Sequence, residues 1–266
     1  MTFSFFAKGS GRVHVCGHRG HCIGAPENTL AAFRIAHDLG ATSCEIDTVL
    51  TRDGEIAVIH DLLVDRTTNG SGAVCDMTLA EVQALDAGSS FSAAFAGERV
   101  PALRQAIDLA HDLDMGLEIE IKEKRDLPRY YAALERVLNR PGDLDRIMMI
   151  SFDHVSLRNA KSRIPGLKTG AIIHERLGDP VAVARSADLD EMCIDLAVFT
   201  TEDAQALHDA GISIRCHAYH PEAIAAAERA GLAWTEFLHD ALKAGHIDTL
   251  SGDDVDWLRR SIESAV

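Results

Sequence analysis

The stretch "VHVCGHRGHCIGAPENTLAAFRIAHDLGATSCEIDTVL", residues 13–50, holds one complete strand–helix–strand unit. The apolar run 13–17 predicts a buried strand, and "ENTLAAFRIAHDLG" (27–40) has the spacing of an amphipathic helix that ends at a glycine. The run "SCEIDTVL" (43–50) predicts a second strand. A strand, a helix and a second strand in this order indicate two parallel strands of one sheet.

The same alternation continues along the chain, with helical stretches such as "TEDAQALHDAG" (201–211) between the apolar runs. The predicted strands are 13–17, 43–50, 116–122, 146–151, 168–173, 191–196, 212–217 and 232–237. Eight strand–helix repeats are the number that a (β/α)₈ TIM barrel requires, whereas an open Rossmann sheet would favour a glycine-rich fingerprint after the first strand. No such fingerprint is present. We therefore predict an α/β protein in which residues 1–266 form a single TIM-barrel domain.

A small insertion, about residues 51–100, interrupts the second unit after its strand. Asp53-Gly54 lies between two alternating runs and predicts a tight hairpin turn, and "TTNGSG" (67–72) predicts a loop. Because TIM-barrel enzymes do their chemistry at the carboxyl ends of the strands, the insertion is expected above the active face.

Composition narrows the classes of partner. The chain is 47% hydrophobic and carries 26 Lys and Arg against 41 Asp and Glu, a formal charge of -15. This charge disfavours nucleic acid and anionic membranes as partners. The sequence has neither an apolar run long enough for a membrane span nor a signal-peptide start, so we expect a cytoplasmic protein without stable membrane association. Its six cysteines lack metal-ligand spacing and are expected as small core residues.

Carboxylates on two predicted strands point to a metal site. Glu45 and Asp47 are two residues apart and share one face, as do Glu118, Glu120 and Lys122 on the next barrel strand. Charged groups inside a barrel must be paired or bind a metal, and three acidic oxygens suit Mg²⁺ or Ca²⁺. The alternative is that these acids form ion pairs with Lys122 or Arg19 and only fill the barrel mouth.

Two histidines at predicted strand ends have the chemistry of an acid/base pair. His18, in "GHRG", directly follows the first strand, and His60 ends the inserted hairpin. The unperturbed pKa of histidine lies near neutrality, so one ring can protonate a leaving oxygen while the other deprotonates a nucleophile. Arg19 and Lys122 supply positive charge for a phosphate group.

At this point the motifs resemble those of the glycerophosphodiester phosphodiesterase family. The similar segments are "GHRG", "APENTLAAF", "GATSCEIDTVLTRDGEIAVIHD", "RTTNGSG", "LAEVQALDAG", "VPALRQAID" and "LEIEIK". The resemblance implies hydrolysis of a small-molecule glycerophosphodiester to glycerol 3-phosphate and an alcohol, with one bound divalent cation. It also implies that Glu45, Asp47 and Glu120 are metal ligands, His18 and His60 the catalytic pair, and Arg19 and Lys122 the phosphate contacts. Either a substrate hydroxyl or water would attack phosphorus.

The last third of the chain departs from the family's pattern. His217 and His220 stand in "HAYH" where relatives tend to carry Trp and Asn, and Glu236, on the predicted eighth strand, stands where Asp is usual. Replacing an apolar wall by histidines favours a more polar leaving group, such as a sugar or polyol, although the two histidines could also pack at a loop. His174, Glu175 and Asp195 end or follow predicted strands and are further candidates for the same mouth.

Two other functions remain open at this level. A lysophospholipase-D-like or sphingomyelinase-D-like enzyme would use a related barrel, but this acidic, aromatic-poor chain offers no apolar or cationic membrane-facing loop. A catalytically silent binding barrel is the non-enzyme alternative, and the presence of all seven site residues argues against it.

Overall fold

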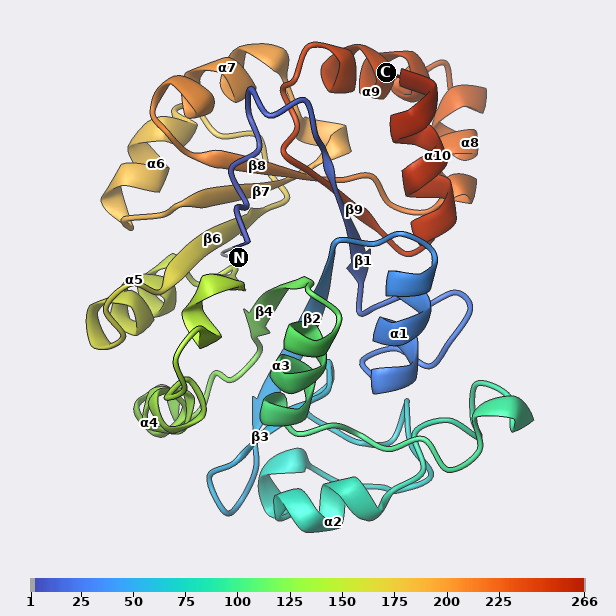
Figure 1. The fold of residues 1–266 in the computed structure, drawn as a ribbon, viewed down its shortest axis with the longest axis vertical. Helices are drawn as coiled ribbons and strands as arrows, with labels where there is room; N and C mark the ends of the chain where they lie inside the picture. The colour runs from blue at the N-terminus through green and yellow to red at the C-terminus, as the bar shows by residue number, and fades with distance from the viewer. Residues whose placement is uncertain (1–2, 266) are drawn as a thin grey trace.

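The computed structural model describes residues 3–265, and its centre is a closed barrel of eight parallel strands (Figure 1). The barrel strands are β1 (His14–His18), β2 (Ser43–Leu50), β4 (Gly116–Ile121), β5 (Ile147–Ser151), β6 (Lys168–Ile173), β7 (Glu191–Asp195), β8 (Ser213–His217) and β9 (Thr249–Gly252). β1 pairs in parallel with both β2 and β9, so the sheet closes on itself. The TIM-barrel prediction is confirmed.

Helices surround the barrel and cover the outer faces of its strands (Figure 1). They are α1 (Leu30–Asp38), α3 (Leu103–Asp112), α4 (Leu127–Val137), α5 (His154–Arg163), α6 (Pro180–Ser186), α7 (Thr201–Asp209), α8 (Pro221–Arg229), α9 (Trp234–Lys243) and α10 (Val255–Ala265). The first helix begins at Leu30, within the predicted stretch 27–40, because the Thr29 side chain accepts a hydrogen bond from the backbone of Ala32 and so caps its first turn.

Alternation along the strands separates the apolar core from the site. On β2, Cys44 and Ile46 belong to the main hydrophobic cluster that packs between barrel and helices. The intervening Glu45 and Asp47 must point the opposite way, into the barrel. Both carboxylates are almost completely buried, with exposed fractions of 2% and 1%. The fold therefore places two acids in a confined interior.

The insertion extends from the carboxyl end of β2. Its strand β3 (Ile56–Val58) pairs antiparallel with β2 to form the predicted hairpin, and the other elements are η1 (Val74–Asp76), α2 (Leu79–Ala84) and η2 (Ala93–Phe95). A small hydrophobic cluster of its own, including Ile59, Val64 and Val82, holds the segment together. This packing fixes the backbone that carries His60, two residues beyond β3.

The prediction of the eighth strand at 232–237 is wrong. Residues 234–243 form α9, and the eighth barrel strand is β9, which lies further along the chain. The apolar residues Trp234, Phe237, Leu238, Ala241 and Leu242 recur at helical rather than strand spacing. In contrast, β9 is only four residues long, and its buried Thr249 and Ser251 give it little hydrophobic signal.

All six cysteines are unpaired. Cys16, Cys44, Cys193 and Cys216 are buried, as expected of small core residues, while Cys22 and Cys75 are partly exposed. Within residues 3–265, no helix combines the length and apolar character needed to cross a bilayer.

Candidate active site

A cavity of about 330 Å³ opens among the carboxyl ends of the barrel strands. It is lined by His18, Arg19, Glu45, His60, Glu120 and Lys122 from the first part of the chain, and by Phe152, His174, Asp195, Arg215, His217 and Tyr219 from the later strands, among others. Of the seven residues predicted from sequence, only Asp47 does not line the cavity, and it lies buried between its partners, in contact with Arg19 and Lys122. The structure thus brings all seven together.

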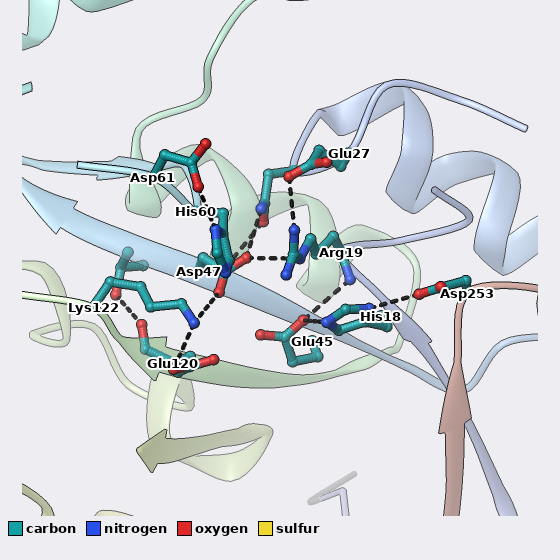
Figure 2. A network of polar contacts seen from close by, with 12 residues as sticks. His18, Arg19, Glu27, Glu45, Asp47, His60, Asp61, Glu120, Lys122 and Asp253 are labelled. Carbon is teal, nitrogen blue, oxygen red and sulfur yellow. Dashed lines mark hydrogen bonds and ion pairs between the residues drawn. The ribbon is translucent and has the colours of Figure 1, made fainter. Parts of the chain in front are cut away.

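Three carboxylates converge on one side of this cavity (Figure 2). Asp47 on β2 is the direct cross-strand partner of Glu120 on β4, and one oxygen from each of Glu45, Asp47 and Glu120 lies within 4.8 Å of the others. Glu45 Oε1 and Asp47 Oδ1 are buried without a hydrogen-bond donor. Burial and the neighbouring Asp47 carboxylate raise the pKa of Glu45. Oxygen atoms that lack donors at a shared point fit a hard divalent cation.

Two cationic side chains flank the carboxylates. The ammonium nitrogen of Lys122 lies 2.8 Å from Glu120 Oε1 and 3.4 Å from Asp47 Oδ1, and Arg19 Nε lies 3.2 Å from Asp47 Oδ2. Burial opposes ionisation of Asp47, but these two cations outweigh it and lower the pKa of that carboxyl. The ion pairs that the sequence offered as an alternative to a metal site are therefore present. Even so, Glu45 Oε1 has no donor, and Asp47 Oδ1 has only the Lys122 ammonium at 3.4 Å, which does not form a hydrogen bond with it.

Asn28 secures the position of Asp47. Its amide nitrogen donates to Asp47 Oδ2 over 2.8 Å, and its amide oxygen accepts from the Asp47 backbone N–H over 3.1 Å. Asn28 has a positive φ of 58°, a left-handed conformation that asparagine adopts more readily than most residues. Sequence reasoning missed this residue, whose only local signal is its place before the Thr29 helix cap.

His18 is held between two acids. Its Nδ1 lies 2.6 Å from Asp253 Oδ1, and its Nε2 lies 3.8 Å from Glu45 Oε2 (Figure 2). Although burial opposes its ionisation, the hydrogen bond with His18 lowers the pKa of Asp253 to about 2. Asp253 directly follows β9. It was not predicted as a site residue because the eighth strand was expected at 232–237, well before β9.

His60 ends a chain of charged contacts that runs back to Arg19, and Figure 2 shows its two end contacts, His60 with Asp61 and Glu27 with Arg19. His60 Nδ1 lies 2.6 Å from Asp61 Oδ1, and Arg66 Nε donates to Asp61 Oδ2 over 2.6 Å. Arg66 also binds both oxygens of Glu27, which accepts from Arg19 over 3.0 Å. Burial lowers the pKa of His60 and so favours the neutral form of its ring. The network orients one His60 nitrogen and leaves the other for chemistry.

The far wall of the cavity is formed by later strands. His174 Nδ1 lies 2.7 Å from Asp195 Oδ2, and the Phe152 ring stacks on His174 with centroids 4.9 Å apart. His217 packs edge-on against His18 and Tyr219, and burial lowers the pKa of His217 to about 3. Of the candidates for the mouth, His174, Asp195 and His217 therefore face it, whereas Glu175 is exposed and does not line the cavity.

Two other residues of the last third do not reach this mouth. His220 is exposed at the start of α8 and contacts Glu222. Glu236 is exposed on α9, because its segment is a helix and not the eighth strand. The expectation that these two residues rim the cavity is wrong.

A buried charge cluster lies inside the barrel beside the carboxylates. Glu118 forms an ion pair with Arg215 at 2.9 Å instead of joining the oxygens of Glu45, Asp47 and Glu120. Burial and the nearby Glu118 raise the pKa of Glu191 to about 8. Arg215 also lines the cavity and connects this cluster to the site.

Comparison with known proteins agrees with this geometry. A model of the glycerophosphoryl diester phosphodiesterase family matches residues 18–241. The glycerophosphodiester phosphodiesterase of Caldanaerobacter subterraneus subsp. tengcongensis is 44% identical over 167 residues, which are 62% of this chain and 69% of that protein.

Solved structures extend the similarity over nearly the whole chain. An Oleispira antarctica phosphodiesterase in complex with the product sn-glycerol-3-phosphate is 27% identical, with a TM-score of 0.81 over 96% of this chain and 98% of that one. A glycerophosphodiester phosphodiesterase from Agrobacterium tumefaciens is also 27% identical, with a TM-score of 0.76 over 94% of this chain and 100% of the other. On the family match and these likenesses together, the chain belongs to the glycerophosphoryl diester phosphodiesterase family of enzymes.

Proposed function

We propose that this phosphodiesterase hydrolyses a glycerophosphodiester to glycerol 3-phosphate and an alcohol, and that it uses one divalent cation and two histidines. The observation that carries the proposal is the cluster of three carboxylates, two cations and two histidines around one cavity, which all of them except Asp47 line. The Oleispira antarctica relative, solved in complex with its product sn-glycerol-3-phosphate, supports the same reaction.

Glu45, Asp47 and Glu120 are the proposed ligands of the cation. Their donor set contains only oxygen, which selects Mg²⁺ or Ca²⁺ over softer metals. When bound, such an ion withdraws electron density from phosphoryl oxygens and lowers the barrier to attack on phosphorus.

Arg19 and Lys122 are the proposed phosphate contacts. Both line the cavity and lie next to Asp47, which holds their charged ends at the carboxylate cluster. There they compensate the negative charge that a phosphoryl group develops in its transition state.

The two histidines differ in their surroundings, and the difference supports a separate role for each. Burial favours the neutral ring of His60, and its Nδ1 contacts Asp61, so its other nitrogen can accept a proton from the attacking hydroxyl. His18 faces the Asp253 carboxylate, which stabilises a positive charge on its ring. We therefore assign His60 as the general base and His18 as the general acid that protonates the leaving oxygen.

The wall formed by His174, Asp195 and His217 supports a hydroxyl-bearing leaving alcohol, such as a sugar or polyol. A ring nitrogen 2.7 Å from a carboxylate oxygen must carry a proton, because two acceptors do not approach this closely. The remaining nitrogen of a neutral His174 is then an acceptor. Together with Asp195 it offers acceptors to substrate hydroxyl groups.

Hydrolysis of a small substrate panel tests these proposals. Protein stripped with EDTA and resupplied with Mg²⁺ or Ca²⁺ should release glycerol 3-phosphate from glycerophosphocholine and glycerophosphoglycerol, and His18→Ala or His60→Ala should reduce turnover by roughly two or more orders of magnitude. Asp195→Asn should reduce the preference for glycerophosphoglycerol over glycerophosphocholine. Metal-independent turnover, or normal activity in either histidine variant, would refute the corresponding role.

A further inference from the structure

A second group of potential metal ligands lies next to the carboxylate cluster and has a different chemistry. His18, Cys22 and Asp253 each offer a ligand atom, one nitrogen, one sulfur and one oxygen, and these atoms all lie within 4.8 Å of one another. They come from the end of β1, from the loop that follows it and from the loop after β9. Barrel closure brings them together, since β1 and β9 are paired neighbours.

Asp253 is the centre of this group. Its carboxylate lies 2.6 Å from His18 Nδ1 and also accepts from the thiol of Cys22. Two proton-bearing groups thus converge on one carboxylate, and both can act as metal ligands once a proton is lost.

The group is open to solvent on two sides. His18 lines the main cavity, and Cys22 lines a neighbouring cavity of about 200 Å³ together with Glu27 and Arg66. The side chains of His18 and Asp253 are 26% and 25% exposed. An ion can therefore reach all three residues without unfolding of the barrel.

We propose that His18, Cys22 and Asp253 form a separate, inhibitory site for a thiophilic divalent cation of the zinc class. Zinc is commonly held by Cys, His and Asp in a tetrahedral arrangement, with three protein ligands and one open position. The thiol and Nδ1 of the protonated His18 ring each release a proton to solvent, so the cation replaces two hydrogen bonds to Asp253 by three ligand bonds.

Ligand softness separates this site from the carboxylate cluster. Glu45, Asp47 and Glu120 offer only oxygen and favour Mg²⁺ or Ca²⁺, whereas a thiolate favours Zn²⁺, Cd²⁺ or Co²⁺. Both sites can be filled at the same time.

Inhibition follows from the shared histidine and rests on the proposed function. A cation on Nδ1 breaks the His18–Asp253 contact and withdraws electron density from the ring. His18 then no longer has the geometry in which it is proposed to protonate the leaving oxygen.

Cobalt spectroscopy tests the site without reference to activity. Co²⁺ added to the intact protein in excess Mg²⁺ should produce a sulfur-to-cobalt charge-transfer band. The band should vanish in Cys22→Ser and persist in Cys75→Ser. Cys75 is a matched control because it is also partly exposed and lies 3.7 Å from a carboxylate oxygen, that of Asp76.

Inhibition by Zn²⁺ at fixed, saturating Mg²⁺ tests the consequence. Cys22→Ser, which keeps a donor for Asp253, should retain the basal activity and raise the half-inhibitory Zn²⁺ concentration by on the order of 10–100-fold, the range seen when support of a metal site is lost. Cys75→Ser should behave as the wild type. Equal inhibition of Cys22→Ser and the wild type, or a charge-transfer band that survives in Cys22→Ser, would overturn the proposal. If no diester is turned over at all, the proposed function fails, while the cobalt spectrum still decides whether the site exists.

Discussion

The Nδ1 atom of His18 lies 2.6 Å from Oδ1 of Asp253, although 235 positions separate the two residues in the chain. The contact exists because β1 and β9 are neighbours in the closed barrel. The contact leaves Nε2 of His18 free to face Glu45 and the cavity. It thereby connects the last strand of the barrel to His18, the proposed general acid.

Asp253→Asn tests this connection. We expect kcat to fall by roughly 10–100-fold, less than the loss of the histidine itself, because a misoriented acid still donates some protons. KM should change little, since Asp253 does not line the main cavity. Steady-state kinetics on glycerophosphoglycerol measures both constants, and Asp256→Asn, on the exposed side of α10, is the control. An unchanged kcat would show that His18 does not need Asp253.

Glu45→Gln tests the carboxylate cluster through stability. Removing one negative charge from the cluster should raise the melting temperature of EDTA-treated protein, because Glu45 is buried beside Asp47 with an oxygen that lacks a donor. The same change should abolish the stabilisation that Mg²⁺ or Ca²⁺ gives the wild type, which arises because a ligand of the folded state shifts the folding equilibrium. Thermal unfolding with and without metal measures both effects. Glu55→Gln, at the partly exposed position before β3, should keep the response to metal, and a full response in Glu45→Gln would rule out its ligand role.

Arg215→Met tests the buried charge cluster. Removing the arginine leaves Glu118 as an uncompensated buried charge, so we expect the free energy of unfolding to fall by about 3–5 kcal/mol. The double variant Glu118→Gln/Arg215→Met should recover part of this loss, since neither charge of the ion pair then remains in the barrel interior. Urea denaturation provides the values. Equal destabilisation of the single and double variants would mean that the ion pair is not the reason for the loss.

Asp61→Asn tests the network behind His60 through its pH dependence. The hydrogen bond from Arg66, followed by that from His60, lowers the pKa of Asp61 from 3.8 to about 2. A carboxyl whose pKa is lowered in the folded state stabilises the protein at pH values above the ordinary pKa of that carboxyl. The contribution disappears as the pH falls from 3.8 toward 2. Because the pair is partly screened by solvent, the contribution should not exceed about 1 kcal/mol.

Urea denaturation at two pH values, one above and one within this range, measures the contribution of Asp61. The wild type should lose more stability on acidification than Asp61→Asn, and the exposed Asp209→Asn should follow the wild type. Identical acid sensitivity in wild type and Asp61→Asn would contradict the assignment.

Seven of the eight barrel strands could be predicted from the sequence, because each is a short apolar run bounded by turns and flanked by a helical pattern. The strand at 43–50 agrees residue for residue with β2, and 168–173 with β6. The eighth barrel strand could not be predicted in this way. The segment 232–237 carries the stronger apolar signal but forms part of α9, whereas β9 is short and its side chains inside the barrel are polar.

The residues proposed as metal ligands and phosphate contacts could be predicted from the sequence because their arrangement depends on neighbouring positions in the chain. Side chains two positions apart on one strand share a face, so Glu45 with Asp47, and Glu120 with Lys122, are placed together by backbone geometry alone. The positions of His18 and His60 at strand ends follow from the same local pattern.

Local sequence therefore determined the strand–helix repeat and the side of each strand on which a charged residue lies, because these depend on periodicity over a few residues. Tertiary structure alone decided that Asp253 supports His18 and lies beside Cys22, that Glu118 pairs with Arg215 and that His220 and Glu236 do not reach the mouth. These contacts join segments far apart in the chain. Their partners are set by the closure and register of the barrel, which no local pattern encodes.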